Sequence, residues 1–129
     1  MTANGSFNVT LEPQMPAEYP LLGRLTIDKA FQGDLNGISK GQMLSARTGV
    51  NNSAGYVAIE QVTGSLHGRE GSFVLQHSSS MNRGEPQQSI TVVPDSGTDQ
   101  LEGLKGSMTI INAAGVHSYV FEYVLPDRV

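Results

Sequence analysis

The chain has 129 residues, which is the size of one domain built around a single hydrophobic core. Hydrophobic residues make up 38% of it and charged residues 16%, a composition too apolar for an intrinsically disordered protein. Twelve aspartates and glutamates outnumber eight lysines and arginines, and the net charge of -4 argues against a nucleic-acid-binding protein.

Membrane and secretion signals are not expected either. No apolar stretch approaches the roughly 18–20 residues of a membrane helix, and residues 1–10 lack the basic region and apolar core of a signal peptide. The absence of cysteine excludes a disulfide scaffold, a thiolate metal site and a cysteine nucleophile. We therefore expect a bacterial-type protein located in the cytoplasm.

Glycine and alternating apolar residues favour strands along the whole chain. The chain has fifteen glycines, which recur every few residues from Gly23 to Gly115, and each would cost about 1 kcal/mol relative to alanine inside a helix. Between them apolar residues alternate with polar ones, a period typical of strands. The pattern predicts about eight strands, over residues 5–12, 21–32, 35–46, 55–66, 71–82, 87–93, 106–112 and 116–125. We expect an all-β fold with one antiparallel β-barrel domain over residues 1–129, a sandwich being the alternative.

The connections between these strands are polar or rich in proline. Prolines within residues 13–20 indicate an irregular connection after the first strand. Residues 48–53 and 82–86 are expected to be polar loops at the mouth of the barrel, and residues 99–104 are the one stretch that could form a helical turn.

One hairpin can be placed in register from its turn. A type II′ turn favours glycine at its first central position, so we expect a two-residue turn at Gly68-Arg69. Counting outward from this turn places Glu60 directly opposite His77. The more apolar face of this hairpin, which we expect inside the barrel, carries Tyr56, Val62, Phe73 and Leu75. A buried carboxylate beside an imidazole holds the ring in one tautomer, as in general acid–base catalysis. The same pair can also be purely structural, with each group satisfying the other.

The last predicted strand has one bulky face. That face carries His117, Tyr119, Phe121, Tyr123 and Leu125. Pointing inward, it would add two phenols to the barrel interior. Pointing outward, it would form an aromatic stripe suited to a subunit interface, with Glu122 as the inward carboxylate. Burial preference favours the inward orientation.

Two further patterns point to chemistry only weakly. Residues 37–41 match the G-x-S-x-G pattern of hydrolases by letter, but the segment continues as a strand and no helix follows. Glycines 33, 37 and 41 share one face of that region, which favours close backbone approach or barrel curvature.

The three histidines lack metal-binding spacing, so no metal and no cofactor are expected. A site made of Glu60, His77 and His117 is the alternative.

Several segments together resemble a bacterial family known as domain of unknown function 3224. They are Asp28-Lys29 and the segments Phe31–Leu35, Lys40–Ser45, Ser53–Glu60, Gly68–His77, Val92–Thr98, Leu101–Gly106 and His117–Tyr123. The similarity spans roughly residues 22–125. It implies an antiparallel β-barrel similar to that of allene oxide cyclases and dirigent proteins, and it implies no activity.

Three functions are compatible with these patterns. The first is a barrel that binds a small hydrophobic or amphipathic molecule, because an eight-stranded barrel has room for side chains or for one small ligand. The second is an isomerase or cyclase that uses Glu60 and His77 as an acid–base pair. The third is a barrel that self-associates into a homo-oligomer. The residues expected to contact a ligand are Tyr56, Glu60, His77, Tyr119 and Tyr123.

Overall fold

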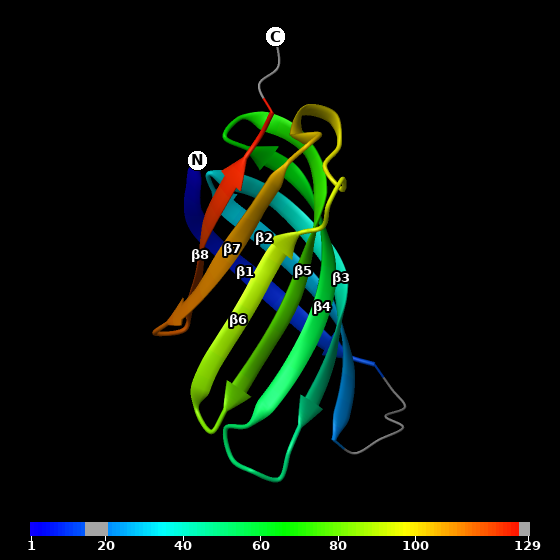
Figure 1. Cartoon of the computed structure of the whole chain (residues 1–129), viewed down its shortest axis with the longest axis vertical. Helices are drawn as coiled ribbons and strands as arrows, with labels where there is room; N and C mark the ends of the chain where they lie inside the picture. Colours follow the sequence, from blue (N-terminus) through cyan, green and yellow to red (C-terminus); the bar gives the residue numbers. More distant parts are fainter. Residues whose placement is uncertain (15–20, 127–129) are drawn as a thin grey trace.

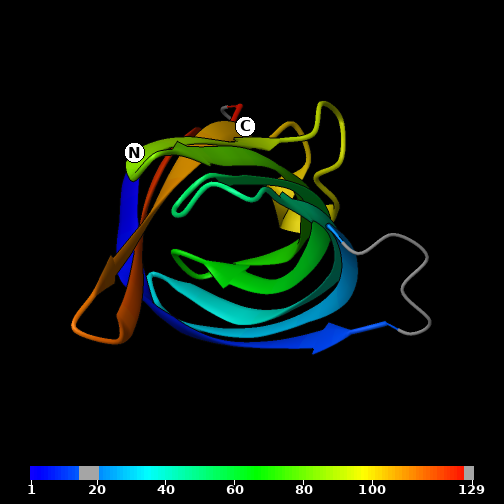
Figure 2. The same cartoon turned by 90° about the horizontal axis from the view of Figure 1, so that it is seen from below.

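The computed structural model describes residues 1–14 and 21–126 and shows a closed antiparallel barrel of eight strands (Figures 1 and 2). The strands follow one another around the barrel in chain order. They are β1 (Thr2–Pro13), β2 (Leu22–Gly33), β3 (Leu35–Arg47), β4 (Ala54–Leu66), β5 (Arg69–Asn82), β6 (Glu85–Val92), β7 (Lys105–Ala113) and β8 (Val116–Val124). The predicted strands and the barrel are confirmed, with strand ends displaced by at most three residues.

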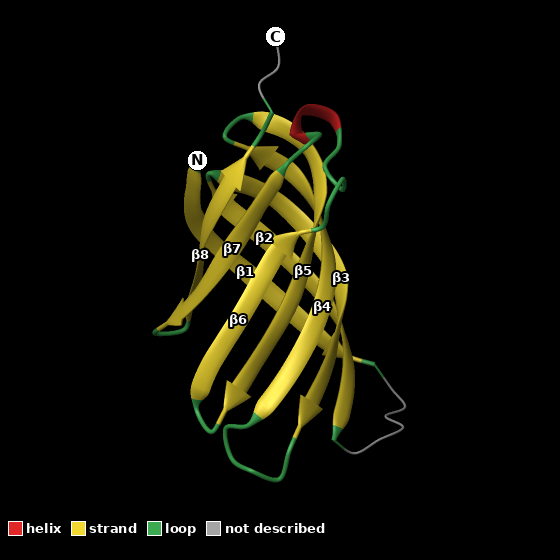
Figure 3. Ribbon diagram, in the orientation of Figure 1, coloured by secondary structure: helices red, strands yellow, loops and turns green. Residues whose placement is uncertain are grey.

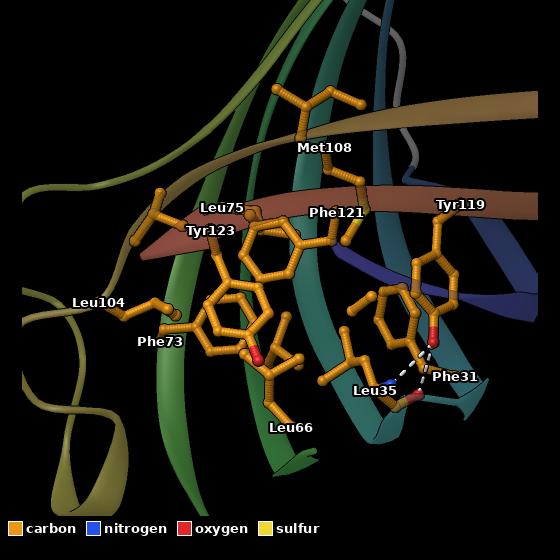
Figure 4. Packing of buried hydrophobic residues seen from close by; sticks show 14 of the residues in the cluster. Phe31, Leu35, Leu66, Phe73, Leu75, Leu104, Met108, Tyr119, Phe121 and Tyr123 are labelled. Carbon is orange, nitrogen blue, oxygen red and sulfur yellow. Dashed lines mark hydrogen bonds between the residues drawn. The ribbon is translucent and has the colours of Figure 1, made fainter. Parts of the chain in front are cut away.

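One end of the barrel is filled by side chains, and we call it the packed end. The connection between β6 and β7 covers it and contains a short 3₁₀ turn, η1 (Asp99–Leu101), where the sequence allowed a helical turn (Figure 3). Leu101 and Leu104 from this connection are buried in the core. Figure 4 shows the packing, in which the Phe73 and Phe121 rings stack with centroids 5.8 Å apart. The opposite end, where the β3–β4 and β5–β6 connections lie, is called the open end.

The bulky face of β8 points inward, as predicted. Tyr119, Phe121 and Tyr123 are 1%, 0% and 3% exposed. Glu122 lies on the outer face, where its carboxylate accepts a hydrogen bond from the Thr2 hydroxyl. The aromatic stripe therefore belongs to the core and offers no subunit interface.

The predicted register of the β4–β5 hairpin is wrong. The turn lies at His67-Gly68, with φ of 47° and 80°, so Leu66 pairs with Arg69. A type I′ turn needs positive φ at both central residues, and histidine adopts this conformation more readily than most side chains. Glu60 consequently lies opposite Leu75 instead of His77. The register shifts by two residues, an even number, so every side chain keeps its predicted face.

Residues 82–86 also differ from the expected loop. The chain turns tightly at Arg83-Gly84, where φ is 49° and 92°, and Asn82 pairs with Glu85. The β5–β6 connection is therefore a two-residue hairpin. Residues 48–53 form the irregular connection that the sequence predicts.

The barrel closes least firmly between β6 and β7. Thr91 and Ser107 are the single registered pair of these strands, whereas β5 and β6 pair along eight positions. Farther along, the Gln88 side chain accepts a hydrogen bond of 2.8 Å from the backbone N–H of Ile110. A side chain thus replaces part of the missing backbone ladder.

Two glycines of β3 allow it to approach β4 closely. A Cβ atom at Gly37 would lie 2.3 Å from the Thr63 carbonyl oxygen, and one at Gly41 would lie 2.1 Å from that of Ile59. The prediction of close backbone approach is confirmed for both. No helix follows Ser39, which lies between them within β3, so the segment has no nucleophile elbow.

Candidate functional site

A cavity of about 1130 Å³ occupies the open end of the barrel. It is lined by residues from β1 to β7, including Met81 and Pro86 on either side of the β5–β6 turn. Cavities that bind small molecules measure about 300–1000 Å³. This one is large enough for such a ligand, and the packed end closes it on the far side.

The wall of the cavity is mainly apolar, with a few polar groups. Leu25, Met43 and Met81 contribute apolar surface, and the described lining residues include two arginines and no carboxylate. The side chains that offer hydroxyl or amide groups are Gln14, Ser45, Tyr56, Ser79, Ser80, Gln88 and Asn112. An apolar cavity with scattered polar groups fits an amphipathic molecule better than a highly charged one.

Midway along the barrel, a cluster of polar side chains surrounds the Glu60 carboxylate. Lys29 donates to Oε2 at 2.8 Å, His77 donates from Nε2 to the same oxygen at 2.6 Å, and Ser39 donates to Oε1 at 2.8 Å. Glu60 is fully buried, and Ser39, His77 and Lys29 are 2%, 3% and 9% exposed. The predicted contact between Glu60 and His77 is therefore present, along a diagonal of the ladder instead of directly across it.

The charge of Glu60 is fixed by these neighbours. Burial alone would raise the pKa of its carboxyl group, but the His77 hydrogen bond and the Lys29 charge outweigh burial and lower the pKa to about 2. Glu60 is thus an ionised acceptor at neutral pH. A carboxyl group that holds no proton there is unsuited to act as a general acid.

Two members of this cluster, Lys29 and Ser39, were not predicted from the sequence. Ile27, Lys29 and Phe31 occupy alternate positions of β2, and all three are buried inside the barrel. This alternation in the sequence is the signal that could have indicated an inward position for Lys29. Its ammonium group lies 4.9 Å from the Phe7 ring centroid and 5.7 Å from that of Phe31. Ser39 was visible only as part of a hydrolase-like pattern.

His77 and Tyr56 lie where the cluster meets the cavity. Their ring centroids are 6.4 Å apart. Tyr56 lines the cavity, whereas neither Glu60 nor His77 is among its lining residues. Burial raises the pKa of the Tyr56 hydroxyl, and the neighbouring Ser79 side chain offsets part of this rise. Of the predicted site residues, Tyr56 alone forms part of the cavity wall.

Tyr119 and Tyr123 lie elsewhere and do not line the cavity. The Tyr119 hydroxyl contacts the backbone at the start of β3, where it accepts from the N–H of Leu35 and donates to its carbonyl, each at 2.9 Å (Figure 4). The Tyr123 hydroxyl bonds with Nδ1 of His67 at the packed end. Burial raises the pKa of both phenols. The structure gives both hydroxyls partners within the fold instead of a place in the cavity.

The described part of the chain offers no metal site. Within residues 1–14 and 21–126, no group of three histidine, aspartate or glutamate side chains is placed to hold a metal ion. His117, the third member of the alternative metal site, stacks on Phe7 with ring centroids 5.2 Å apart. No helix in the same residues is long and apolar enough to cross a membrane.

Comparison with known proteins places the chain in a family. Residues 3–123 match the family described as protein of unknown function DUF3224. The chain belongs to this family. It is 45% identical to a DUF3224 protein of unknown function from Shewanella oneidensis MR-1, whose crystal structure it matches with a TM-score of 0.93 over 99% of this chain and 98% of the other.

No curated protein matches the chain. The family resemblance seen in the sequence is thus confirmed, and DUF3224 membership brings no activity with it. The likeness to allene oxide cyclases and dirigent proteins stays a prediction.

Proposed function

We propose that this DUF3224 protein binds a small, mainly apolar molecule in the cavity at the open end of its barrel. The observation that carries the proposal is the cavity itself, of about 1130 Å³, in a barrel whose other end is densely packed. An eight-stranded barrel can be filled by side chains along its whole length. Here only part of the interior is filled, which leaves space for a ligand.

The separation of the barrel into a packed end and an open end supports this function. The buried apolar cluster includes Leu66, Phe73, Leu101, Leu104 and Phe121, none of which lines the cavity. Burial of such side chains stabilises the fold by roughly 1.5–3 kcal/mol each. The protein therefore has a core that does not depend on the contents of the cavity.

An acid–base enzyme is the second candidate, favoured by the 2.6 Å contact between Glu60 and His77. The low pKa of Glu60 weighs against the form of this hypothesis in which the carboxyl group transfers a proton near neutral pH. Any proton transfer in this region would have to use His77, Lys29 or Tyr56 instead. Binding without reaction requires no such step and accounts for the same cavity.

Native mass spectrometry of freshly purified protein tests the proposed function, followed by denaturing analysis of released molecules. We expect a reproducible small molecule that leaves on denaturation. Ser45→Trp would fill the cavity and prevent its retention, because Ser45 lines the wall. Gln42→Trp is the matched control, since Gln42 is exposed on β3 and does not line the cavity. The proposal fails if purified protein is empty and takes up nothing from a cell extract.

Self-association stays a prediction, and so does a location in the cytoplasm. The outer surface of β3 and β4 carries Leu44, Val57 and Ile59, which are 57%, 51% and 50% exposed, and Leu44 lies directly opposite Val57. Apolar surface of this kind is a candidate subunit contact. The same native mass spectrum counts the subunits, and a monomer at micromolar concentration would contradict a homo-oligomer.

A further inference from the structure

One buried atom of the central cluster has no partner. Among the described residues, Nδ1 of His77 is the only buried side-chain nitrogen or oxygen without a hydrogen bond. Buried polar atoms of native proteins nearly always have a partner, and each exception requires an explanation. The other groups of the cluster, on Lys29, Ser39 and Glu60, are bonded to one another.

The hydrogen bonds of Glu60 determine which proton His77 carries. An ionised carboxylate only accepts hydrogen bonds, so His77 must donate to it from Nε2. The Lys29 ammonium already balances the Glu60 carboxylate. A second proton on the buried ring would leave one uncompensated positive charge in the cluster, which is costly. With its one proton on Nε2, a neutral ring carries on Nδ1 a lone pair that can accept a hydrogen bond.

The direction of the Nδ1 lone pair indicates where it lies relative to the cavity. The two nitrogens of an imidazole point in nearly opposite directions, so Nδ1 is directed away from Glu60. On the open-end side of His77, the next inward residue of β5 is Ser79, which lies opposite Tyr56 on β4 and Gln88 on β6. All three line the cavity. The unpartnered acceptor thus lies just behind the inner wall, separated from the cavity by about one layer of side chains.

We propose that the cavity takes an apolar molecule bearing a neutral hydroxyl group, a phenol or an alcohol, and that this hydroxyl donates to Nδ1 of His77. The inference rests on the proposed binding function and names its ligand class. Tyr56 is half-buried on the cavity wall, with its ring beside that of His77, and it is the side chain that moves to admit the hydroxyl. A ligand that only accepts hydrogen bonds, including any carboxylate, is disfavoured at this lone pair.

Two probes that differ mainly in the hydroxyl group test this inference, 2-naphthol and 2-methylnaphthalene. We expect the wild-type protein to bind 2-naphthol about tenfold more tightly in isothermal titration calorimetry, because one satisfied hydrogen bond distinguishes the two probes. In His77→Gln, the side-chain amide still donates to Glu60 but places no acceptor at the Nδ1 position. This variant is expected to bind both probes equally, at the affinity of the wild type for 2-methylnaphthalene.

Long-range ¹H–¹⁵N NMR of the histidine side chains gives a second measurement. We expect His77 to be the Nε2–H tautomer, and its Nδ1 resonance to move when 2-naphthol is added but not when 2-methylnaphthalene is added. Tyr56→Ala opens the path to Nδ1, and we expect it to raise the affinity for 2-naphthol more than that for 2-methylnaphthalene.

The outcomes separate the two proposals. Equal binding of both probes by the wild type overturns the hydroxyl inference and leaves the binding function standing. A proton on Nδ1 at neutral pH, or an unchanged preference in His77→Gln, overturns the inference as well. If neither probe binds, the inference fails, and the native mass spectrum then decides the binding function on its own. An unfolded His77→Gln variant would lose both probes together, so loss of preference alone cannot be a folding defect.

Discussion

Replacement of Glu60 by glutamine should remove a pH-dependent part of the stability of this protein. The pKa of the Glu60 carboxyl group falls from an ordinary value of 4.5 to about 2 in the folded state, because His77 and Lys29 outweigh the effect of burial. A difference of 2.5 units corresponds to about 3 kcal/mol at roughly 1.4 kcal/mol per unit. Because the folded-state pKa is lowered, this stabilisation is complete above the unfolded-state pKa and is lost as the pH falls towards 2.

The pH dependence gives the assay. Urea unfolding of the wild type and of Glu60→Gln at pH 7 should show the variant less stable by about 3 kcal/mol, within the range found when one partner of a buried ion pair is removed. At pH 3 about 2 kcal/mol of the Glu60 contribution has been lost from the wild type, so the gap should narrow to about 1 kcal/mol.

Glu85→Gln is the matched control for this experiment. Glu85 is exposed at the start of β6, and its replacement should change stability by no more than about 0.5 kcal/mol at either pH. A gap between the wild type and Glu60→Gln that stays constant from pH 7 to pH 3 would refute the reasoning. It would mean that Glu60 titrates alike in the folded and unfolded chains.

Two further substitutions test other parts of the structure. Tyr119→Phe removes the hydroxyl that bonds with the backbone of Leu35, and should lower the free energy of unfolding by about 1–3 kcal/mol in urea titration; an unchanged midpoint would show that these bonds contribute nothing. Gly37→Ala should destabilise the barrel and lower its thermal midpoint, because the new Cβ would lie 2.3 Å from the Thr63 carbonyl oxygen. Gly49→Ala is its control, since no atom lies within 4 Å of the added Cβ, and equal midpoints in the two variants would contradict the steric argument.

Much of the fold could be predicted from local patterns. The alternation of apolar residues identified each strand, and the inward face of β8 followed from the preference of Tyr119, Phe121 and Tyr123 for burial. The turn of the β4–β5 hairpin could not be placed in the same way. A glycine at position 68 suits either the first residue of a type II′ turn or the second residue of a type I′ turn, and the two alternatives differ in where His67 lies.

Only part of the candidate site could be predicted from the sequence, for a different reason. Glu60 and His77 lie on adjacent strands joined by a tight hairpin, so their contact follows from local register within a small error. Lys29 comes from β2 and reaches Glu60 across β3, a distance that no hairpin specifies. The cavity exists because the side chains at the open end do not fill the space between the strands. Whether they fill it depends on the combined volume of residues from seven strands, which no single segment of the sequence shows. The sequence predicts a ligand contact for Tyr119 and Tyr123 because it does not show that their hydroxyls bond within the fold.

The weak closure between β6 and β7 determines where the barrel wall opens most easily. Most backbone links around the barrel consist of long ladders, whereas this one has a single registered pair and the bond from Ile110 to the Gln88 side chain. Thermal opening costs least where the fewest hydrogen bonds must break together. Gln88 and Asn112 face the cavity from the two sides of this junction. Local opening of the barrel is therefore expected first between β6 and β7, beside the cavity, while the packed end stays folded.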